Sequence, residues 1–298
     1  MTGSTTGSTT GSTIEFLDDA AAFLEAAGEW LAERPVEATV VATVAQRSAR
    51  DGAPTGVPYW WAVARDSDAG VVGAAMRTAP FEPYPAYVLS MPDQAAVELA
   101  RQVNARGERL QGVNGTMPAA RLVAEETSRL AGRSAWVLEH TRLWEATRID
   151  APGVEGRLRQ AREDEVALAR EWYLDFGAAA AEQAGRADPH PSEVLDDEQM
   201  LHRIRSGAIW FWDRDGEAVC IVGVSAPAFG VVRIGPVLTP QPHRGHGYAS
   251  AGVARAAQDA LDAGHRVCLF TDVDNPVSNH IYAAVGFRPL ADTANYVC

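Results

Sequence analysis

The stretch from Ile234 to Ala249 has residue types suited to binding an anion. It reads IGPVLTPQPHRGHGYA, a pattern that predicts a strand, a glycine-containing turn and the start of a helix. The backbone N–H groups and the positive dipole end at a helix N-terminus bind phosphate oxygens, and glycine lets those oxygens approach the backbone. Arg244 adds a positive charge beside the turn. We therefore expect a phosphate-binding turn at residues 244–249.

Two better-known phosphate-binding loops do not fit this turn. All 26 basic residues of the chain are arginine, so a Walker A loop, a pyridoxal Schiff base and a protein-kinase lysine are excluded. Residues 245–250, GHGYAS, lack the third glycine of the dinucleotide fingerprint, and no ribose-binding acid follows where one is expected. The pattern that fits is Arg-x-x-Gly-x-Ala, at Arg244, Gly247 and Ala249.

A second group of residues, 274–287 (DNPVSNHIYAAVGF), contains a candidate proton donor. At about 100° per residue of a helix, Asn275, Ser278, Asn279 and Tyr282 share one face, and the apolar residues fall nearly opposite. A phenol has a pKa of about 10, so it keeps its proton at neutral pH and can act as a general acid.

Together the two groups resemble the GNAT acetyltransferase superfamily. Its motif is Arg/Gln-x-x-Gly-x-Gly/Ala between the fourth strand and the third helix, followed by an Asn, a helix, a Tyr and Gly-Phe, here Gly286-Phe287. The resemblance runs from about Arg157 to Cys298. It implies acetyl-CoA as co-substrate and an α+β fold whose mixed, mostly antiparallel sheet is flanked by helices. The fourth and fifth strands of this sheet would splay apart to bind the acetyl-CoA.

The resemblance also implies a role for each site residue. Tyr282 is the implied catalytic residue, which would protonate the departing CoA thiolate. Backbone amides of the turn would bind the pyrophosphate, Asn275 or Asn279 would hydrogen-bond the pantetheine arm, and the main chain of the fourth strand would face the thioester. The implied cofactor-binding residues are Val237, Thr239, Arg244, Gly245, His246, Gly247, Tyr248, Ala249, Asn275 and Asn279.

The general base is not evident from these motifs. Many members of the superfamily carry a glutamate on the fourth strand, but residues 231–239 contain no acid. The alternatives are Glu171 or Asp175 in the first helix of the second half, the terminal carboxylate at Cys298, and a water relay.

The composition excludes several classes of function. The net charge is −13 and both halves are acidic, so no nucleic-acid partner is expected. No apolar stretch approaches the roughly 20 residues of a membrane span and no signal pattern is present, so we expect a cytoplasmic protein that does not bind membranes. His243 and His246 lack a recognisable third ligand, so no metal site is expected. Cys220 and Cys268 lie in apolar strands and should pack in the core.

The length of 298 residues predicts about two domains. Residues 1–13 repeat TGST and are expected to form a disordered tail. In the first domain, residues 14–150, we expect helices at 14–33, 93–105 and 118–131 and strands at 36–44, 59–63, 71–76, 87–90 and 136–144. Pro152, Gly153 and Gly156 indicate a linker. In the second domain, residues 151–298, we expect strands at 157–161, 208–212, 217–224, 231–239 and 267–271, helices at 164–178, 192–205, 248–263 and 276–285, and a closing strand.

The similar order of elements in the two halves favours tandem GNAT-like domains, of which the N-terminal one is degenerate. The junction corresponding to the phosphate-binding turn is expected at residues 110–119, where neither motif recurs.

These observations predict an N-acetyltransferase that moves acetyl from acetyl-CoA to a primary amine of a small molecule by direct attack in a ternary complex. The acidic composition favours a cationic acceptor such as an amino sugar, a polyamine or an amine-bearing antibiotic, and an amino-thiol precursor is a rival. The alternatives are a non-catalytic CoA-binding regulatory protein and a protein or peptide N-acetyltransferase. The oligomeric state is not indicated.

Overall fold

The chain folds into two compact units. The structure is a computed structural model that describes residues 12–53, 56–79, 82–185 and 195–298. Unit 1 contains the described residues up to 30, together with 47–136 and 295–298, and unit 2 contains 31–46 and 137–294. Most of the tail expected at 1–13 lies outside the described residues, and Thr13 begins the first strand.

Unit 1 is built on a mixed sheet. Its strands lie in the order β1-β2-β3-β4-β5, with antiparallel pairs except for the parallel pair β4–β5, and the end of β12 follows β5. The elements are β1 (Thr13–Leu17), α1 (Ala20–Glu33), α2 (Thr39–Asp51), β2 (Trp60–Arg65), β3 (Val71–Arg77), β4 (Ala86–Val88), α3 (Asp93–Ala105), β5 (Gly112–Thr116) and α4 (Ala119–Leu130). The end of α1 and the start of α2 belong to unit 2.

Unit 2 has a sheet of the same kind, in the order β12-β6-β11-β10-β9-β8-β7. The pair β10–β11 is parallel, and β6–β11, β9–β10, β8–β9 and β7–β8 are antiparallel. The elements are β6 (Trp136–Ala146), β7 (Arg157–Gln160), η1 (Glu163–Glu165), α5 (Val166–Gln183), α6 (Asp197–Arg205), β8 (Ile209–Arg214), β9 (Glu217–Val224), β10 (Val231–Leu238), η2 (Gln241–His243), α7 (Tyr248–Asp262), β11 (Arg266–Asp272), α8 (Pro276–Val285) and β12 (Arg288–Val297).

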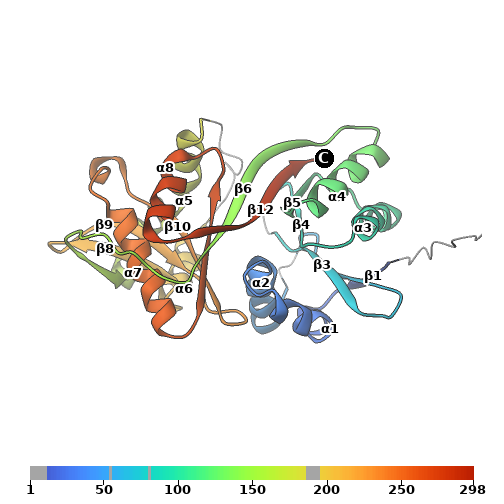
Figure 1. The fold of residues 1–298 in the computed structure, drawn as a ribbon, viewed down its shortest axis with the longest axis horizontal. Helices are drawn as coiled ribbons and strands as arrows, with labels where there is room; N and C mark the ends of the chain where they lie inside the picture. The colour runs from blue at the N-terminus through green and yellow to red at the C-terminus, as the bar shows by residue number, and fades with distance from the viewer. Residues whose placement is uncertain (1–11, 54–55, 80–81, 186–194) are drawn as a thin grey trace, which may run out of the picture. The chain divides into compact units, whose positions relative to one another are not determined.

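The two halves of the chain contain the same series of helices and strands. Each runs strand, two helices, three strands, helix, strand, helix, strand, the first half ending at β6 and the second at β12 (Figure 1). The last strands are exchanged, because β6 pairs with β11 of unit 2 and the end of β12 lies beside β5 of unit 1.

The expected domains, 14–150 and 151–298, therefore differ from the two units. Residues 31–46 and residues 137–146 of β6 belong to unit 2, and residues 295–298 belong to unit 1. Without a neighbour on this side, the edge of β11 would leave backbone groups unpaired. Strand β6 pairs with this edge in antiparallel register from Ala146 to Thr141.

Most of the expected helices and strands are present, but the first two are wrong. The helix expected at 14–33 begins only at Ala20, because residues 13–17 pair with β2 as a strand. The strand expected at 36–44 overlaps the helix α2. Its buried residues recur at helical spacing, since Ala38, Val41, Ala45 and Ser48 are all buried. This single buried face outweighs the strand preference of the valines.

Hydrophobic clusters cover both faces of the unit 2 sheet and fix the helices that flank the site. Helix α7 packs closely on β9, where a Cβ at Gly252 would lie 2.8 Å from Val222 Cγ2. On the other face, Trp172 of α5 packs edge-on against Phe211 of β8, with ring centroids 5.5 Å apart. Cys220 and Cys268 pack in the core as expected, and burial raises the pKa of these thiols to about 12 and about 11.

Candidate active site

Strands β10 and β11 separate in the middle of the unit 2 sheet. Their parallel pairing ends at Ile234 and Leu269, after which β10 continues beside β9 alone and β11 continues beside β6. The register of β10 shifts between Ile234 and Val237. Pro236, which has no N–H to donate, lies within this bulge and follows a cis peptide bond. The expected splay is therefore present.

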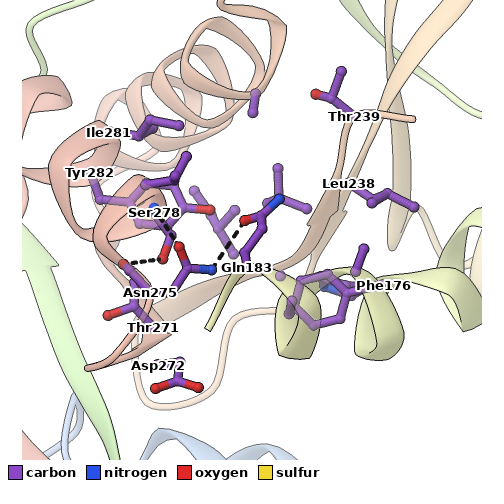
Figure 2. A pocket seen from close by; sticks show the side chains of 18 of the residues that line it. Phe176, Gln183, Leu238, Thr239, Thr271, Asp272, Asn275, Ser278, Ile281 and Tyr282 are labelled. Carbon is purple, nitrogen blue, oxygen red and sulfur yellow. Dashed lines mark hydrogen bonds between the residues drawn. The ribbon is translucent and has the colours of Figure 1, made fainter. Parts of the chain in front are cut away.

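A cavity of about 810 Å³ opens where the strands separate. Figure 2 shows Ile281 and Tyr282 of α8 on one side of it, and on the other Leu238, the last residue of β10, with Thr239 directly after it. Helix α5 and the first turn of α7 complete the wall. Because β11 has diverged, alternate backbone N–H and C=O groups at the end of β10 have no strand partner on this side. Val237 and Thr239 both line the cavity.

The turn before α7 has the geometry of an anion site. Gly245 and Gly247 have φ angles of 83° and 78°, in the left-handed region that glycine adopts at little cost. No described side chain caps the N-terminus of α7, so the first N–H groups of the helix are left for a ligand. Arg244, Gly245, Gly247 and Ala249 all line the cavity.

Three side chains hold this turn in place. Arg244 Nε donates a hydrogen bond to the Thr239 carbonyl oxygen over 3.2 Å. The His246 ring stacks on the Tyr248 ring at 5.4 Å, and Tyr248 is buried, with its hydroxyl accepting a hydrogen bond from Arg214 over 2.7 Å. Because its ring is buried and its hydroxyl is bonded to Arg214, Tyr248 can contribute to an anion site only through its main chain. The His246 ring is exposed and does not line the cavity, and its Nδ1 lies within hydrogen-bond distance of the His243 and Arg244 carbonyl oxygens.

The expected pantetheine ligands, Asn275 and Asn279, occupy different environments. Asn275 lines the cavity, its Oδ1 caps α8 by accepting from Ser278 N, and its Nδ2 donates to Gln183 Oε1 over 3.1 Å (Figure 2). Asn279 is not among the lining residues. Its Oδ1 accepts from the Thr271 hydroxyl, and its Nδ2 donates to the carbonyl oxygens of Asp272 and Val273. Asn279 therefore joins α8 to the end of β11.

Tyr282, the expected proton donor, lines the cavity from α8. Its ring meets Phe287 edge-on, with centroids 6.2 Å apart. Burial raises the pKa of the phenol above its ordinary value of 10, because the charged phenolate loses hydration. The side chain is therefore protonated at neutral pH, as a general acid must be.

The acids expected as general bases lie elsewhere. Glu171 and Asp175 are exposed and do not line the cavity, and Cys298 lies in unit 1. The acidic side chains that line it, within the described part of the chain, are Glu139 of β6 and Asp272 of β11. Asp272 could have been suspected from its place after an apolar strand, whereas Glu139 comes from the exchanged strand.

The described residues contain no group of three or more His, Cys, Asp or Glu placed to hold a metal ion. They also contain no helix long and apolar enough to cross a membrane.

The corresponding region of unit 1 differs in both features. By the order of elements, the equivalent of the β10–α7 turn is the β4–α3 junction and not residues 110–119, which join β5 to α4. This junction is shorter, with 4 residues against 9. Strand β4 stays paired with β5 to its end, where a Cβ on Gly115 would overlap the Val88 carbonyl oxygen. Unit 1 therefore has neither the long turn nor the splay.

Comparisons with known proteins agree with this geometry. Residues 168–287 match the Acetyltransferase (GNAT) family. A tandem GNAT protein from the clavulanic acid biosynthesis pathway is similar in structure, at 17% identity and a TM-score of 0.54, covering 96% of this chain and 98% of that one. So is a GCN5-related N-acetyltransferase from Sphaerobacter thermophilus, at 14% identity and a TM-score of 0.55, covering 96% and 94%.

A GNAT family acetyltransferase from Colwellia psychrerythraea is similar at 10% identity and a TM-score of 0.52, covering 96% of this chain and 98% of that one. No curated protein matches the chain in sequence. At these identities the structural likeness establishes the fold alone, and the family match covers residues 168–287.

Proposed function

Because the chain belongs to the GNAT acetyltransferase superfamily and is an acyltransferase of that family, we propose that it transfers acetyl from acetyl-CoA to a primary amine of a small molecule. One observation carries this proposal: a single cavity connects the uncapped start of α7, the splayed edge of β10 and the Tyr282 side chain. These are the three features that binding and cleaving a CoA thioester requires.

The residues of the α7 turn fit the phosphates of CoA. A Cβ at Gly245 would meet no atom within 4 Å, so the space in front of the turn is open. The helix N-terminus offers N–H donors and a positive dipole end, and Arg244 adds an exposed positive charge. We infer that the main chain of residues 244–249 binds the pyrophosphate.

Acetyl-CoA supplies the activated thioester, and the chain supplies orientation and a proton. The unpaired backbone groups of β10 near Val237 and Thr239 would hold the pantetheine amides and orient the thioester carbonyl. Asn275 would contact the pantetheine arm from the opposite wall, held in place by the hydrogen bonds of its side chain to Ser278 N and Gln183. The Tyr282 hydroxyl would donate its proton to the leaving sulfur.

The size of the cavity favours a small acceptor. Its volume of about 810 Å³ would have to hold the reacting end of acetyl-CoA as well as the acceptor, so the acceptor would occupy only part of it. Glu139 and Asp272 place negative charge in the wall, which suits the ammonium form in which an amine arrives.

We also infer that unit 1 is a second, degenerate GNAT-like domain. Its helices and strands follow the same order as those of unit 2, while the splay and the long turn are missing from it. The similarity to a tandem GNAT protein over nearly the whole chain supports this inference.

The test is calorimetric titration of acetyl-CoA, followed by thiol-release assays with a panel of small primary amines. The proposal expects binding and acetyl-CoA-dependent thiol release with at least one small amine. Binding without turnover would favour a CoA-binding regulatory protein, and turnover confined to peptides would favour a protein N-acetyltransferase. Failure of the native protein to bind acetyl-CoA would refute the proposal.

A further inference from the structure

Arg233 is a charged side chain in the cavity wall that has no ion-pair partner among the described residues. Its Nη1 is shielded from solvent and makes no hydrogen bond there. A shielded donor of a charged group without a partner is unfavourable. By contrast, Arg159, another half-buried arginine of unit 2, is held by Glu165 at 2.8 Å and Asp213 at 2.7 Å. Arg233 is therefore left without the kind of partner that the fold supplies to Arg159.

The strand register places Arg233 on the same sheet face as the two cavity acids. Arg233 lies opposite Cys268, and Phe270 and Asp272 follow on that face because side chains alternate along a strand. Asp272 lies opposite Thr141 of β6, and alternation again brings Glu139 to this face. All of these except the fully buried Cys268 line the cavity.

This group lies away from the phosphate-binding turn. Thr239 lies six positions after Arg233, which at about 3.3 Å per residue amounts to at most roughly 20 Å along the chain. Figure 2 likewise shows Asp272 and Thr239 far apart in the cavity. Arg233 therefore belongs to the end of the cavity that the phosphates would not occupy, where an acceptor would bind.

Resting on the proposed function, we propose that the acceptor is an amine that also carries a carboxylate, and that Arg233 binds this carboxylate. A guanidinium matches a carboxylate with two parallel hydrogen bonds. Glu139 and Asp272 in the same wall suit the ammonium, so the wall complements a zwitterion. A phosphate dianion would meet two acidic side chains there and is disfavoured.

The reaction balances for such an acceptor. The ammonium first loses a proton to solvent water to give the free amine. A nitrogen–carbon bond to the acetyl group then forms as the carbon–sulfur bond breaks. The second proton of the nitrogen is lost as the sulfur gains one, giving an N-acetyl amino acid and CoA.

The test pairs substrates that differ only in the acidic group. Thiol release is measured with α-, β- and γ-amino acids, each paired with its carboxamide, and with phosphate-bearing amines of similar size. The native protein should turn over at least one acid with a kcat/KM tenfold or more above that of its carboxamide. Arg233→Met should lower kcat/KM for the acid tenfold or more, because KM rises. The kcat/KM for the carboxamide and the affinity for acetyl-CoA should stay unchanged.

The matched control is Arg255→Met, on the exposed side of α7, where Arg255 pairs with Asp259 at 2.8 Å. It should behave as the native protein does. The preference of the native protein for acids tests the inference even if Arg233→Met does not fold.

A kcat/KM for carboxamides or phosphate-bearing amines as high as that for the acids would overturn the inference. So would an unchanged acid preference in Arg233→Met, or acetyl-CoA binding without turnover of any acid. A native protein that does not bind acetyl-CoA fails at the first titration, and the proposed function then fails together with this inference.

Discussion

Two substitutions of Gly247 test the turn before α7: alanine changes only the backbone conformation that the turn can adopt, and glutamate also adds a negative charge. Gly247 has a φ angle of 78°, and a Cβ there would lie 3.2 Å from Val154 Cγ2. An L-residue in this left-handed conformation costs about 1–2 kcal/mol, so the free energy of unfolding of Gly247→Ala should be lower than that of the native protein by this amount. Gly247→Glu also places a carboxylate where the phosphates would bind. Losing one charge-assisted hydrogen bond, about 1.5–3 kcal/mol, weakens acetyl-CoA binding about 10- to 150-fold.

Gly264→Ala is the matched control for Gly247→Ala. Gly264 has a φ angle of 80°, with no atom within 4 Å of an added Cβ, and it lies beyond the C-terminus of α7, outside the cavity. Denaturant unfolding should show similar losses of stability for the two alanine variants. Calorimetry should show weakened acetyl-CoA binding only for the variants at Gly247. Native affinity in Gly247→Glu, or an equal loss in Gly264→Ala, would refute the assignment of this turn.

Three further outcomes are expected. Tyr282→Phe should lower kcat about 100-fold or more with unchanged acetyl-CoA affinity. Because burial raises the Tyr282 pKa, loss of this acid should not reduce the native kcat below about pH 10; a native alkaline limb at pH 8–9 that disappears in the variant would contradict this. Arg159→Met should cost about 1–3 kcal/mol at pH 7, because Asp213 loses its ion-pair partner, whereas Glu165 keeps Arg162 at 2.9 Å. Arg159 holds the Asp213 pKa below its usual value, so the native stability from this pair is present above about pH 4 and is lost as the pH falls further; urea unfolding at pH 7 and pH 3 would show it. Calorimetry should give one acetyl-CoA per chain, and a stoichiometry of two would contradict the assignment of unit 1 as degenerate.

Where local residues mark the start and the end of a helix, both the helix and its first and last residues could be predicted from the sequence. Helix α8 spans the predicted 276–285, because Asn275 caps it, Pro276 fits its first turn, and Gly286 ends it at a φ angle of 114°. The bulge in β10 was likewise predictable, because Pro236 cannot donate a ladder hydrogen bond.

Elements defined by distant contacts could not be predicted in this way. The valines of α2 favour a strand locally, and only the burial of one helical face decides the outcome. The exchange of β6 and β12 leaves no local signal either, because any strand with a suitable apolar pattern could pair with the edge of β11 or β5.

The site follows the same division. Gly245, Gly247 and Tyr282 were predictable because a local pattern carries the chemistry. Arg233 and Glu139 were not, because their meeting depends on the register of β10, β11 and the exchanged strand β6. The resemblance implied Asn275 or Asn279 as a ligand of the pantetheine arm, and only the contacts of Asn279 show that it binds β11.

A common order of elements is thus not enough to make a CoA site. Units 1 and 2 both place a parallel strand pair before a helix, but the start of α3 has Pro92 as its cap and Asp93 in its first turn. That carboxylate satisfies the positive end of the helix dipole and would repel a phosphate. In unit 2 the equivalent turn has glycine in place of an acid, and the bulge at Gly235-Pro236 opens the strands. Under the proposed function, the capacity to bind a CoA thioester would therefore lie in two short backbone departures, each under ten residues long, and not in the fold that the two halves share.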